Sequence, residues 1–196
     1  MWNERYAGDE YVYGTAPNAF LAEHAKVLTG PVLSLAEGEG RNAVYLASLG
    51  LDVLGVDLAD VGLAKARKLA AAKGVVIRTE VADLAAYDPP ADSFGAVVSI
   101  FAHLPSVIRR RLYPLVERSL KPGGLLLLEA YTPAQLPKTT GGPKDPDMLM
   151  TAAGLRVEFP QLEVIFAREL DRMVAEGGHR LGGVGSVVQF IARQRA

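Results

Sequence analysis

The 196-residue sequence predicts an α/β domain built on a doubly wound, mainly parallel sheet with an antiparallel edge. Between residues 31 and 131, short and continuously apolar runs alternate with runs at helical spacing, which is typical of a parallel sheet covered by helices on both faces. Further on, two strand-like runs are joined by a glycine-rich connection with no helix between them. We therefore expect an antiparallel hairpin added to one edge of the sheet.

The individual elements follow in order along the chain. A helix is expected to begin at Pro17, because proline suits the first helical position. Gly50 and Gly74 are expected to end the next two helices. Pro114 is expected to kink or interrupt the helix before the turn "KPGG". The expected strands cover residues 32–35, 52–57, 75–81, 95–101, 125–131, 162–174 and 185–194.

Composition narrows the class of protein. Hydrophobic residues make up 49% and charged residues 22%, as in a soluble globular domain, and the formal net charge of -1 gives no reason to expect nucleic acid or a membrane surface as partner. The absence of cysteine excludes disulfides, thiolate metal sites and cysteine nucleophiles. The N-terminus lacks the order of a signal peptide, and no apolar run reaches the ~20 residues of a membrane helix. A cytoplasmic protein acting on a small molecule is expected.

A glycine turn follows the first strand and opens the next helix. Gly38, Gly40 and Ala43 give the pattern G-x-G-x-x-A, which allows a tight turn and the close approach of a ligand. Asp57 lies at the end of the second strand, where an acid can accept hydrogen bonds from both hydroxyls of a ribose. The pattern predicts a nucleoside site, although the same glycines can simply shape a strand-to-helix turn.

Two glutamates, Glu37 and Glu39, occupy this turn. They would repel a pyrophosphate, because like charges ~4 Å apart cost about 1 to 4 kcal/mol. S-adenosylmethionine carries an ammonium and a sulfonium and has no phosphate, so the acids favour it over NAD, whose oxidoreductase chemistry is the alternative. We expect Glu37 to accept from the ammonium and Glu39 to be a solvated loop residue.

The third strand ends beside Asp83, which is expected to reach the adenine amino group while the backbone N–H of Leu84 meets a ring nitrogen. Capping of the local turn is the alternative role of Asp83. Ligands of open α/β sheets bind outside the carboxyl ends of the strands, so Glu37, Asp57 and Asp83 should meet at one edge.

These residues resemble a class I S-adenosylmethionine-dependent methyltransferase. The likeness covers nearly the whole chain: the glycine turn, Asp57, "VADL", "SIFAHLP", "KPGG" before a strand and the closing hairpin. The opening "WNERYAGDEYVYGTAPNAFL" is similar to the tellurite-resistance and thiopurine methyltransferase-like branch, in which an aromatic segment closes over the cofactor. The resemblance implies a Rossmann-like sheet of seven strands in the order 3-2-1-4-5-7-6, with strand 7 antiparallel. It implies cofactor contacts from Glu37, Gly38, Gly40, Asn42, Asp57, Leu58, Ala82, Asp83, Leu84, Ile100 and Phe101.

The chain departs from the family pattern at two positions. Ser34 stands where most members carry an acid, and Ala36 stands where they carry the first turn glycine. Glu37, three residues after Ser34, is expected to take over the missing acid's partner.

The resemblance implies one domain over residues 1–196. Its expected parts are an N-terminal aromatic arm and helix (1–30), a cofactor-binding core (31–131), a flexible loop (132–150) and a helix and hairpin that cap the sheet (151–196). The three histidines are far apart in sequence, so no metal site is expected. Whether the protein is a monomer or a dimer is left open.

Methyl transfer from a sulfonium is an in-line displacement, in which the enzyme mainly positions two groups and excludes water. His103 is the best-placed candidate base, with capping or packing as the alternative. Trp2, Tyr13 and Tyr131 are expected to line the acceptor pocket. The basic run at residues 109–111 is expected to be a solvated helix face.

The acceptor is expected to be a small molecule. A thiol and a tellurium or selenium oxyanion are candidates, because a soft nucleophile needs little or no general base. A non-catalytic domain that senses S-adenosylmethionine is a further alternative.

Overall fold

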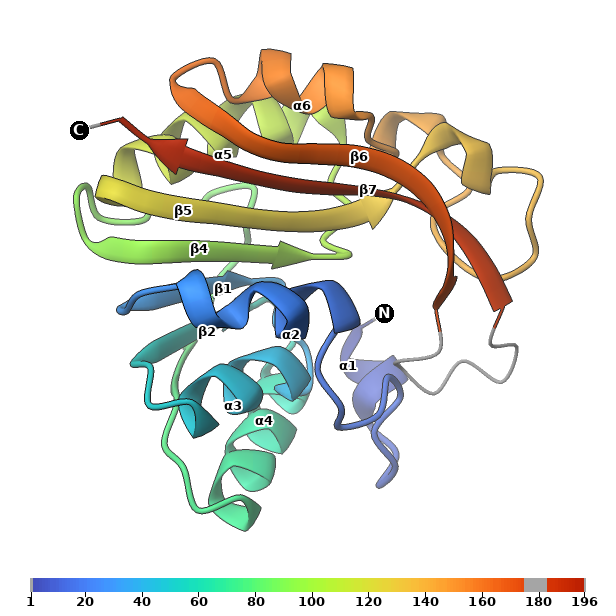
Figure 1. The fold of residues 1–196 in the computed structure, drawn as a ribbon. Helices are drawn as coiled ribbons and strands as arrows, with labels where there is room; N and C mark the ends of the chain where they lie inside the picture. The colour runs from blue at the N-terminus through green and yellow to red at the C-terminus, as the bar shows by residue number, and fades with distance from the viewer. Residues whose placement is uncertain (1, 175–182, 196) are drawn as a thin grey trace.

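The computed structural model describes residues 2–174 and 183–195, and its strands form one seven-stranded sheet in the order β3-β2-β1-β4-β5-β7-β6 (Figure 1). This order confirms the predicted doubly wound sheet. The connection between the last two strands, residues 175–182, lies outside the described residues. The strands are β1 (Val32–Leu35), β2 (Val53–Asp57), β3 (Arg78–Val81), β4 (Phe94–Ile100), β5 (Leu120–Tyr131), β6 (Leu162–Val174) and β7 (Gly183–Gln194).

Strand direction explains the burial pattern. β1 pairs in parallel with β2 and β4, β2 with β3, and β4 with β5, whereas β7 runs antiparallel to both β5 and β6. Every residue of β1 and β4 is buried, as expected for central parallel strands covered on both faces. The predicted hairpin is therefore confirmed, and it places β7 inside the sheet and β6 at its edge.

The helices divide between the two faces of the sheet. α2, α3 and α4 pack on one face, and α5 and α6 pack on the other. α1 packs against α4, near the carboxyl ends of the strands (Figure 1). The helices are α1 (Trp2–Tyr6), α2 (Ala19–His24), α3 (Arg41–Ser48), α4 (Asp60–Ala72), α5 (Ser106–Ser119) and α6 (Ala152–Glu158), with short 3-10 helices η1 (Ala25–Val27), η2 (Pro133–Gln135) and η3 (Pro146–Met148). No helix in the described part of the chain is both long and apolar enough to span a bilayer.

Several element boundaries differ from the expected ones. α2 begins at Ala19 and not at Pro17, because the Asn18 side chain caps it by accepting from the backbone N–H of Leu21 at 2.9 Å. β5 begins at Leu120 and includes the expected turn, since Leu120 pairs with Phe94 before the register shifts. α5 continues through Pro114, because Leu112, Tyr113 and Val116 on its inner face are buried in the core.

The basic run at residues 109–111 is only partly a solvated helix face, because Arg110 and Arg111 are exposed but Arg109 is not. Arg109 is buried, and its guanidinium binds the carboxylate of Glu158 on α6 and the carbonyls of Leu104 and Asp147. Arg109 precedes Leu112 and Val116 at helical spacing, so its stem lies on the inner face of α5. The expectation was wrong for Arg109, because it considered the three charges without the helix face that each one occupies.

Candidate active site

A cavity of about 630 Å³ opens at the carboxyl ends of the parallel strands. This volume lies within the ~300–1,000 Å³ range of small-molecule sites. Most residues singled out in the sequence line it: Trp2, Tyr13, Glu37, Gly38, Asn42, Asp57, Leu58, Asp83, Leu84, Ile100, Phe101, His103 and Tyr131. Gly40 and Ala82 lie outside this lining.

Gly40 and Ala82 shape the site from behind. A Cβ atom on Gly40 would lie 2.6 Å from the Cα of Ala66, and the φ of Gly40 is +94°, so a glycine is needed for α3 and α4 to meet this closely. The backbone N–H of Ala82 donates to the carbonyl of Asp57 at 3.0 Å, which extends the pairing of β2 with β3 up to the cavity.

Glu37 is held inside the glycine turn. Its side chain accepts from the backbone N–H of Ala43 at 2.9 Å and from the hydroxyl of Ser34. The residue is only 6% exposed, and burial raises the pKa of its carboxyl although both hydrogen bonds act in the opposite direction. Glu37 thus places a carboxylate beside Ser34, the position where the resembling family carries its acid.

Asp57 joins the end of β2 to the glycine turn. Its Oδ2 accepts from the backbone N–H of Gly38 and its Oδ1 from that of Ala59, both at 2.8 Å. Burial raises the pKa of Asp57 against these hydrogen bonds. Asp83, after β3, is exposed on the cavity wall and accepts from the backbone N–H of Ala85 at 2.9 Å. Asp83 therefore closes a local turn and also faces the cavity.

Glu39 is not a solvated loop residue, and this expectation was wrong. Its side chain is 3% exposed and forms an ion pair with Lys65 of α4, in which Nζ lies 2.5 Å from Oε1. The other carboxylate oxygen accepts from the backbone N–H of Val12 at 2.8 Å. Lys65 in turn donates to the carbonyls of Gly8 and Glu10 at 2.9 and 2.6 Å. The pair fastens residues 2–14, which we name the N-terminal arm, over α4.

The N-terminal arm forms one wall of the cavity. Trp2 is 43% exposed and stacks on Tyr6 with ring centroids 5.6 Å apart, and the guanidinium of Arg5 lies 5.3 Å from the ring centroids of both Trp2 and Tyr13. Tyr6 is buried where a side chain on Gly38 would meet its hydroxyl at 2.9 Å. Tyr6 lines the cavity as well, although only Trp2 and Tyr13 of this aromatic segment were assigned to the pocket from the sequence.

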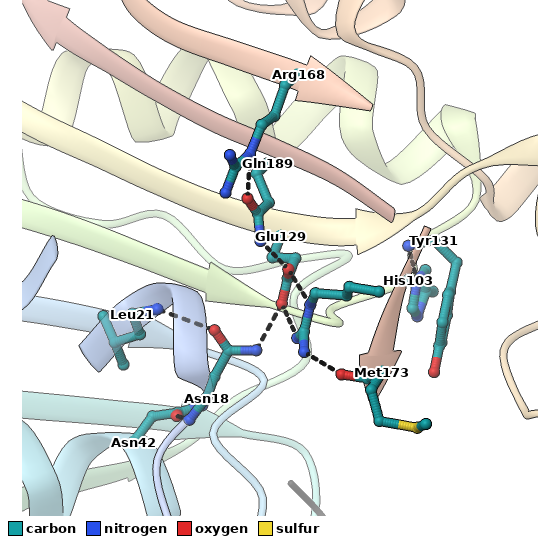
Figure 2. Close-up of polar contacts among 10 residues, drawn as sticks. Asn18, Leu21, Asn42, His103, Glu129, Tyr131, Arg168, Met173 and Gln189 are labelled. Atoms are coloured by element: carbon teal, nitrogen blue, oxygen red, sulfur yellow. Dashed lines mark hydrogen bonds and ion pairs between the residues drawn. The ribbon is translucent and has the colours of Figure 1, made fainter. Parts of the chain in front are cut away.

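His103 and Tyr131 stand together at the ends of β4 and β5. The Nε2 atom of His103 accepts from the backbone N–H of Tyr131 at 3.0 Å, and the two rings stack with centroids 5.3 Å apart (Figure 2). Burial lowers the pKa of His103 to about 4. The imidazole is therefore neutral near pH 7, and its basic nitrogen is already engaged. This geometry favours packing over general-base catalysis.

Charge is unevenly distributed along the described lining. All charged lining residues precede Leu84 in the sequence, whereas the lining from Leu84 onward is uncharged near neutral pH. The charged residues are Arg5, Glu37, Glu39, Arg41, Asp57 and Asp83. The uncharged ones include Phe101, His103, Leu104, Tyr131, Met148 and Val174. The cavity thus has a charged half at β1–β3 and an apolar half at β4–β6, which includes the rings of Phe101, His103 and Tyr131. Within residues 2–174 and 183–195, no group of three or more His, Asp or Glu residues could hold a metal ion.

Sequence comparisons point to one domain family. Residues 32–124 match the family model of a methyltransferase domain. The 2-heptyl-1-hydroxyquinolin-4(1H)-one methyltransferase of Mycobacteroides abscessus is 29% identical over 126 residues, which cover 63% of this chain and 55% of that protein. The chain thus spans about half the length of this curated relative.

Solved structures agree in fold. One, from a study of the conversion of a disulfide bond into a thioacetal group during echinomycin biosynthesis, has a TM-score of 0.80 at 22% identity and covers 99% of this chain and 91% of its own. TehB from Haemophilus influenzae has a TM-score of 0.75 at 18% identity, and the match covers 99% of this chain and 66% of TehB. An S-adenosylmethionine-dependent methyltransferase from Mesorhizobium loti has a TM-score of 0.68 at 22% identity, and the match covers 90% of this chain and 99% of that protein. The chain has the Rossmann-like methyltransferase fold with a matched methyltransferase domain at its centre, which supports an S-adenosylmethionine-dependent methyltransferase.

Proposed function

We propose that this chain transfers a methyl group from S-adenosylmethionine to a small-molecule acceptor and releases S-adenosylhomocysteine. One observation carries the proposal: Glu37, Asp57 and Asp83, at the ends of three adjacent strands, line the same half of one cavity. Carboxylates favour a cationic adenosine ligand. The pyrophosphate of NAD would lie beside Glu37, where like charges ~4 Å apart cost about 1 to 4 kcal/mol, so an NAD-linked oxidoreductase is not favoured.

The charged half provides acceptors for the ammonium, the ribose hydroxyls and the adenine amino group of this cofactor. We assign the ammonium to Glu37, which is already fixed by Ser34 and Ala43. We assign the ribose hydroxyls to Asp57, because its carboxylate lines the cavity and offers more acceptor positions than the backbone N–H groups of Gly38, Leu58 and Ala59 occupy. These assignments require no movement of the glycine turn.

The adenine is assigned to the lining between β2 and β4. Leu58, Leu84 and Ile100 offer apolar surface there, and Asp83 offers a carboxylate for the exocyclic amino group. The backbone N–H of Leu84 is the proposed donor to a ring nitrogen. Phe101, with a φ of +52°, lies where the charged and apolar halves meet.

The sulfonium of the bound cofactor supplies an electrophilic methyl group. The residues of this chain then have two tasks, which are to align the acceptor with that methyl group and to exclude water. The N-terminal arm covers the charged half through Tyr6 and Tyr13. Phe101, His103 and Tyr131 form the aromatic wall on the other side, with Phe101 and Tyr131 ring centroids 4.8 Å apart.

The apolar half favours an acceptor with an apolar, planar body. Because the pKa of His103 is about 4 and its Nε2 accepts from Tyr131, the acceptor must bring a nucleophile that ionises readily, such as a thiol or an acidic hydroxyl. The relative from Mycobacteroides abscessus is named for an acceptor of this kind, a hydroxyquinolinone. A tellurium or selenium oxyanion is the second candidate, favoured by the guanidinium groups of Arg5 and Arg41 in the lining.

Two experiments test the proposal in sequence. Titration calorimetry with S-adenosylmethionine, S-adenosylhomocysteine and NAD should show micromolar binding of the first two and none of NAD. Product analysis with S-adenosylmethionine and a panel of thiophenol, 1-hydroxyquinolin-4(1H)-one, tellurite and selenite should then show methylation of an aromatic member. Methylation of tellurite alone would support the second candidate. Absence of S-adenosylhomocysteine binding would contradict the proposal, and binding without any methylated product would favour a sensing domain.

A further inference from the structure

A fully buried carboxylate lies behind the cavity. Glu129, in β5, is 0% exposed. Arg172 of β6 binds both of its oxygens, with Nε 2.8 Å from Oε1 and Nη2 2.6 Å from Oε2. Gln189 of β7 donates to Oε1 and Asn18 donates to Oε2, each at 2.6 Å. Figure 2 shows Glu129 at the centre of these contacts, between the start of α2 and the hairpin.

Asn18 connects Glu129 to Asn42 in the cavity wall. Its Nδ2 is bound to Glu129, while its Oδ1 accepts from the backbone N–H of Leu21 at 2.9 Å, so both ends of a fully buried side chain are engaged. The backbone N–H of Asn18 donates to Oδ1 of Asn42 at 2.9 Å. A backbone N–H can only donate, so the oxygen of the Asn42 amide must face Asn18.

Asn42 lines the cavity, and its Nδ2 is therefore the amide group that can donate to a ligand there. We propose that this Nδ2 donates to the carboxylate on the amino-acid part of S-adenosylmethionine, and that Asn18 and Glu129 are positioning residues that fix the amide in this orientation. The inference rests on the proposed function and assigns the one group of the cofactor that the acids cannot bind.

The carboxylate needs a donor close to the ammonium. Glu37, Asp57 and Asp83 in the charged half repel a carboxylate, whereas Arg5 and Arg41 in the same half attract it. A ligand that carries an ammonium and a carboxylate on one carbon atom needs an acceptor and a donor side by side. Glu37 accepts from the backbone N–H of Ala43, the residue after Asn42, so the proposed acceptor and the proposed donor lie next to each other on one turn.

A pair of ligands isolates the carboxylate. S-adenosylhomocysteine carries both the ammonium and the carboxylate, whereas its decarboxylated analogue keeps the ammonium, the thioether and the adenosine. The ratio of their dissociation constants, measured by titration calorimetry, reports the carboxylate contacts alone. We expect the wild-type protein to bind S-adenosylhomocysteine at least tenfold more tightly than the analogue.

Four variants, two of them at Asn42, locate the donor. Asn42→Asp keeps an oxygen for the N–H of Asn18 but replaces the Nδ2 donor by a negatively charged oxygen. Asn42→Ala removes the Nδ2 donor without adding a charge. Both should lower the affinity for S-adenosylhomocysteine at least tenfold and leave the analogue within twofold of wild type. Asp57→Asn, the matched control, should weaken both ligands equally. Arg41→Gln should lower the ratio less than Asn42→Ala does, because the neighbouring guanidinium is not the assigned hydrogen-bond partner.

The positioning role has its own test. The double variant Glu129→Gln with Arg172→Gln removes both buried charges together, so that no unpaired charge is left in the core. The ratio should fall at least threefold, a change that a loss of stability alone does not produce. The matched control is the double variant Glu163→Gln with Arg193→Gln, which removes an exposed ion pair of 2.8 Å from the same hairpin and should leave the ratio unchanged.

Specific outcomes would overturn the inference. A wild-type ratio near one would show that the carboxylate is not recognised. A ratio that is retained in Asn42→Ala, or lost in Arg41→Gln instead, would place the donor elsewhere. An unchanged ratio in the Glu129 and Arg172 variant would remove the positioning role. If the wild-type protein binds neither ligand, the proposed function fails and this inference fails with it.

Discussion

Replacing Lys65 by methionine should release the N-terminal arm from α4. The ammonium of Lys65 binds the carbonyls of Gly8 and Glu10 and the carboxylate of Glu39 at distances of 2.5 to 2.9 Å. Methionine keeps most of the apolar stem, so this variant removes the charge and its hydrogen bonds with little loss of packing.

The size of the effect follows from burial. The side chains of Lys65 and Glu39 are 13% and 3% exposed, so they form a buried pair. Removing one partner of a buried pair costs about 3 to 5 kcal/mol, because the other charge is left unpaired. The arm can avoid this cost by lifting, since water then solvates Glu39. A change of about 3 kcal/mol raises the ratio of open to closed arm roughly 100-fold.

Hydrogen exchange measured by mass spectrometry detects this opening. The backbone N–H of Val12 donates to Glu39 at 2.8 Å and should exchange about 100-fold faster in Lys65→Met, whereas peptides from β4 should keep their wild-type rates. Lys68→Met, an exposed position on the same helix, is the matched control and should leave the arm unchanged. Wild-type exchange of the arm in Lys65→Met would refute the reasoning, and so would equal acceleration in β4, which would indicate global destabilisation.

Three further predictions concern the cavity. Asp57→Ala should weaken S-adenosylhomocysteine binding at least tenfold, about 1.4 kcal/mol, in calorimetry, because both proposed ribose contacts are lost; unchanged affinity would count against this role. Gly40→Ala should lower the free energy of unfolding in urea by about 2 to 4 kcal/mol, because a Cβ would meet α4 at 2.6 Å. Gly74→Ala, the control, has a similar positive φ but open space around it and should lower this free energy by only about 1 to 2 kcal/mol. Equal losses in the two variants would exclude the clash as the cause. The pKa of His103 is lowered from 6.5 to about 4, so its stabilising contribution is complete above pH 6.5 and is lost, by about 3 kcal/mol, as the pH falls towards 4. His103→Gln, which can still accept from Tyr131, should lose less unfolding free energy over this interval, and identical pH profiles would contradict the assignment.

The parts of the fold that the sequence predicted depend on local patterns. β1 and β4 are buried throughout and therefore appear as short, mainly apolar runs, which are typical of covered parallel strands. Two acids of the site were found for a similar reason, because Glu37 and Asp57 directly follow such runs, whereas Asp83 follows the polar strand β3. The rule that ligands bind outside the carboxyl ends of strands then brings them together.

The parts that were missed depend on contacts between distant segments. Nothing near Glu39 in the sequence indicates that Lys65 will pair with it, because the contact forms only when α4 packs beside the glycine turn. Glu129 did give a local signal, as the single charge inside the apolar run "LLLLEAY". A lone acid in a buried strand requires a partner, but only the structure identifies that partner as Arg172, 43 residues later.

The two glutamates of the glycine turn show why an acid in such a turn does not by itself specify a ligand. Glu39 is committed to the protein, since one oxygen pairs with Lys65 and the other accepts from Val12. Glu37 also has one partner on each oxygen, but both partners, the hydroxyl of Ser34 and the backbone N–H of Ala43, are neutral. What selects a cationic ligand is therefore the acid beside the cavity that has no ion pair within the protein after folding. By this criterion Glu37 remains a candidate for the ammonium and Glu39 does not, although both acids occupy the same turn.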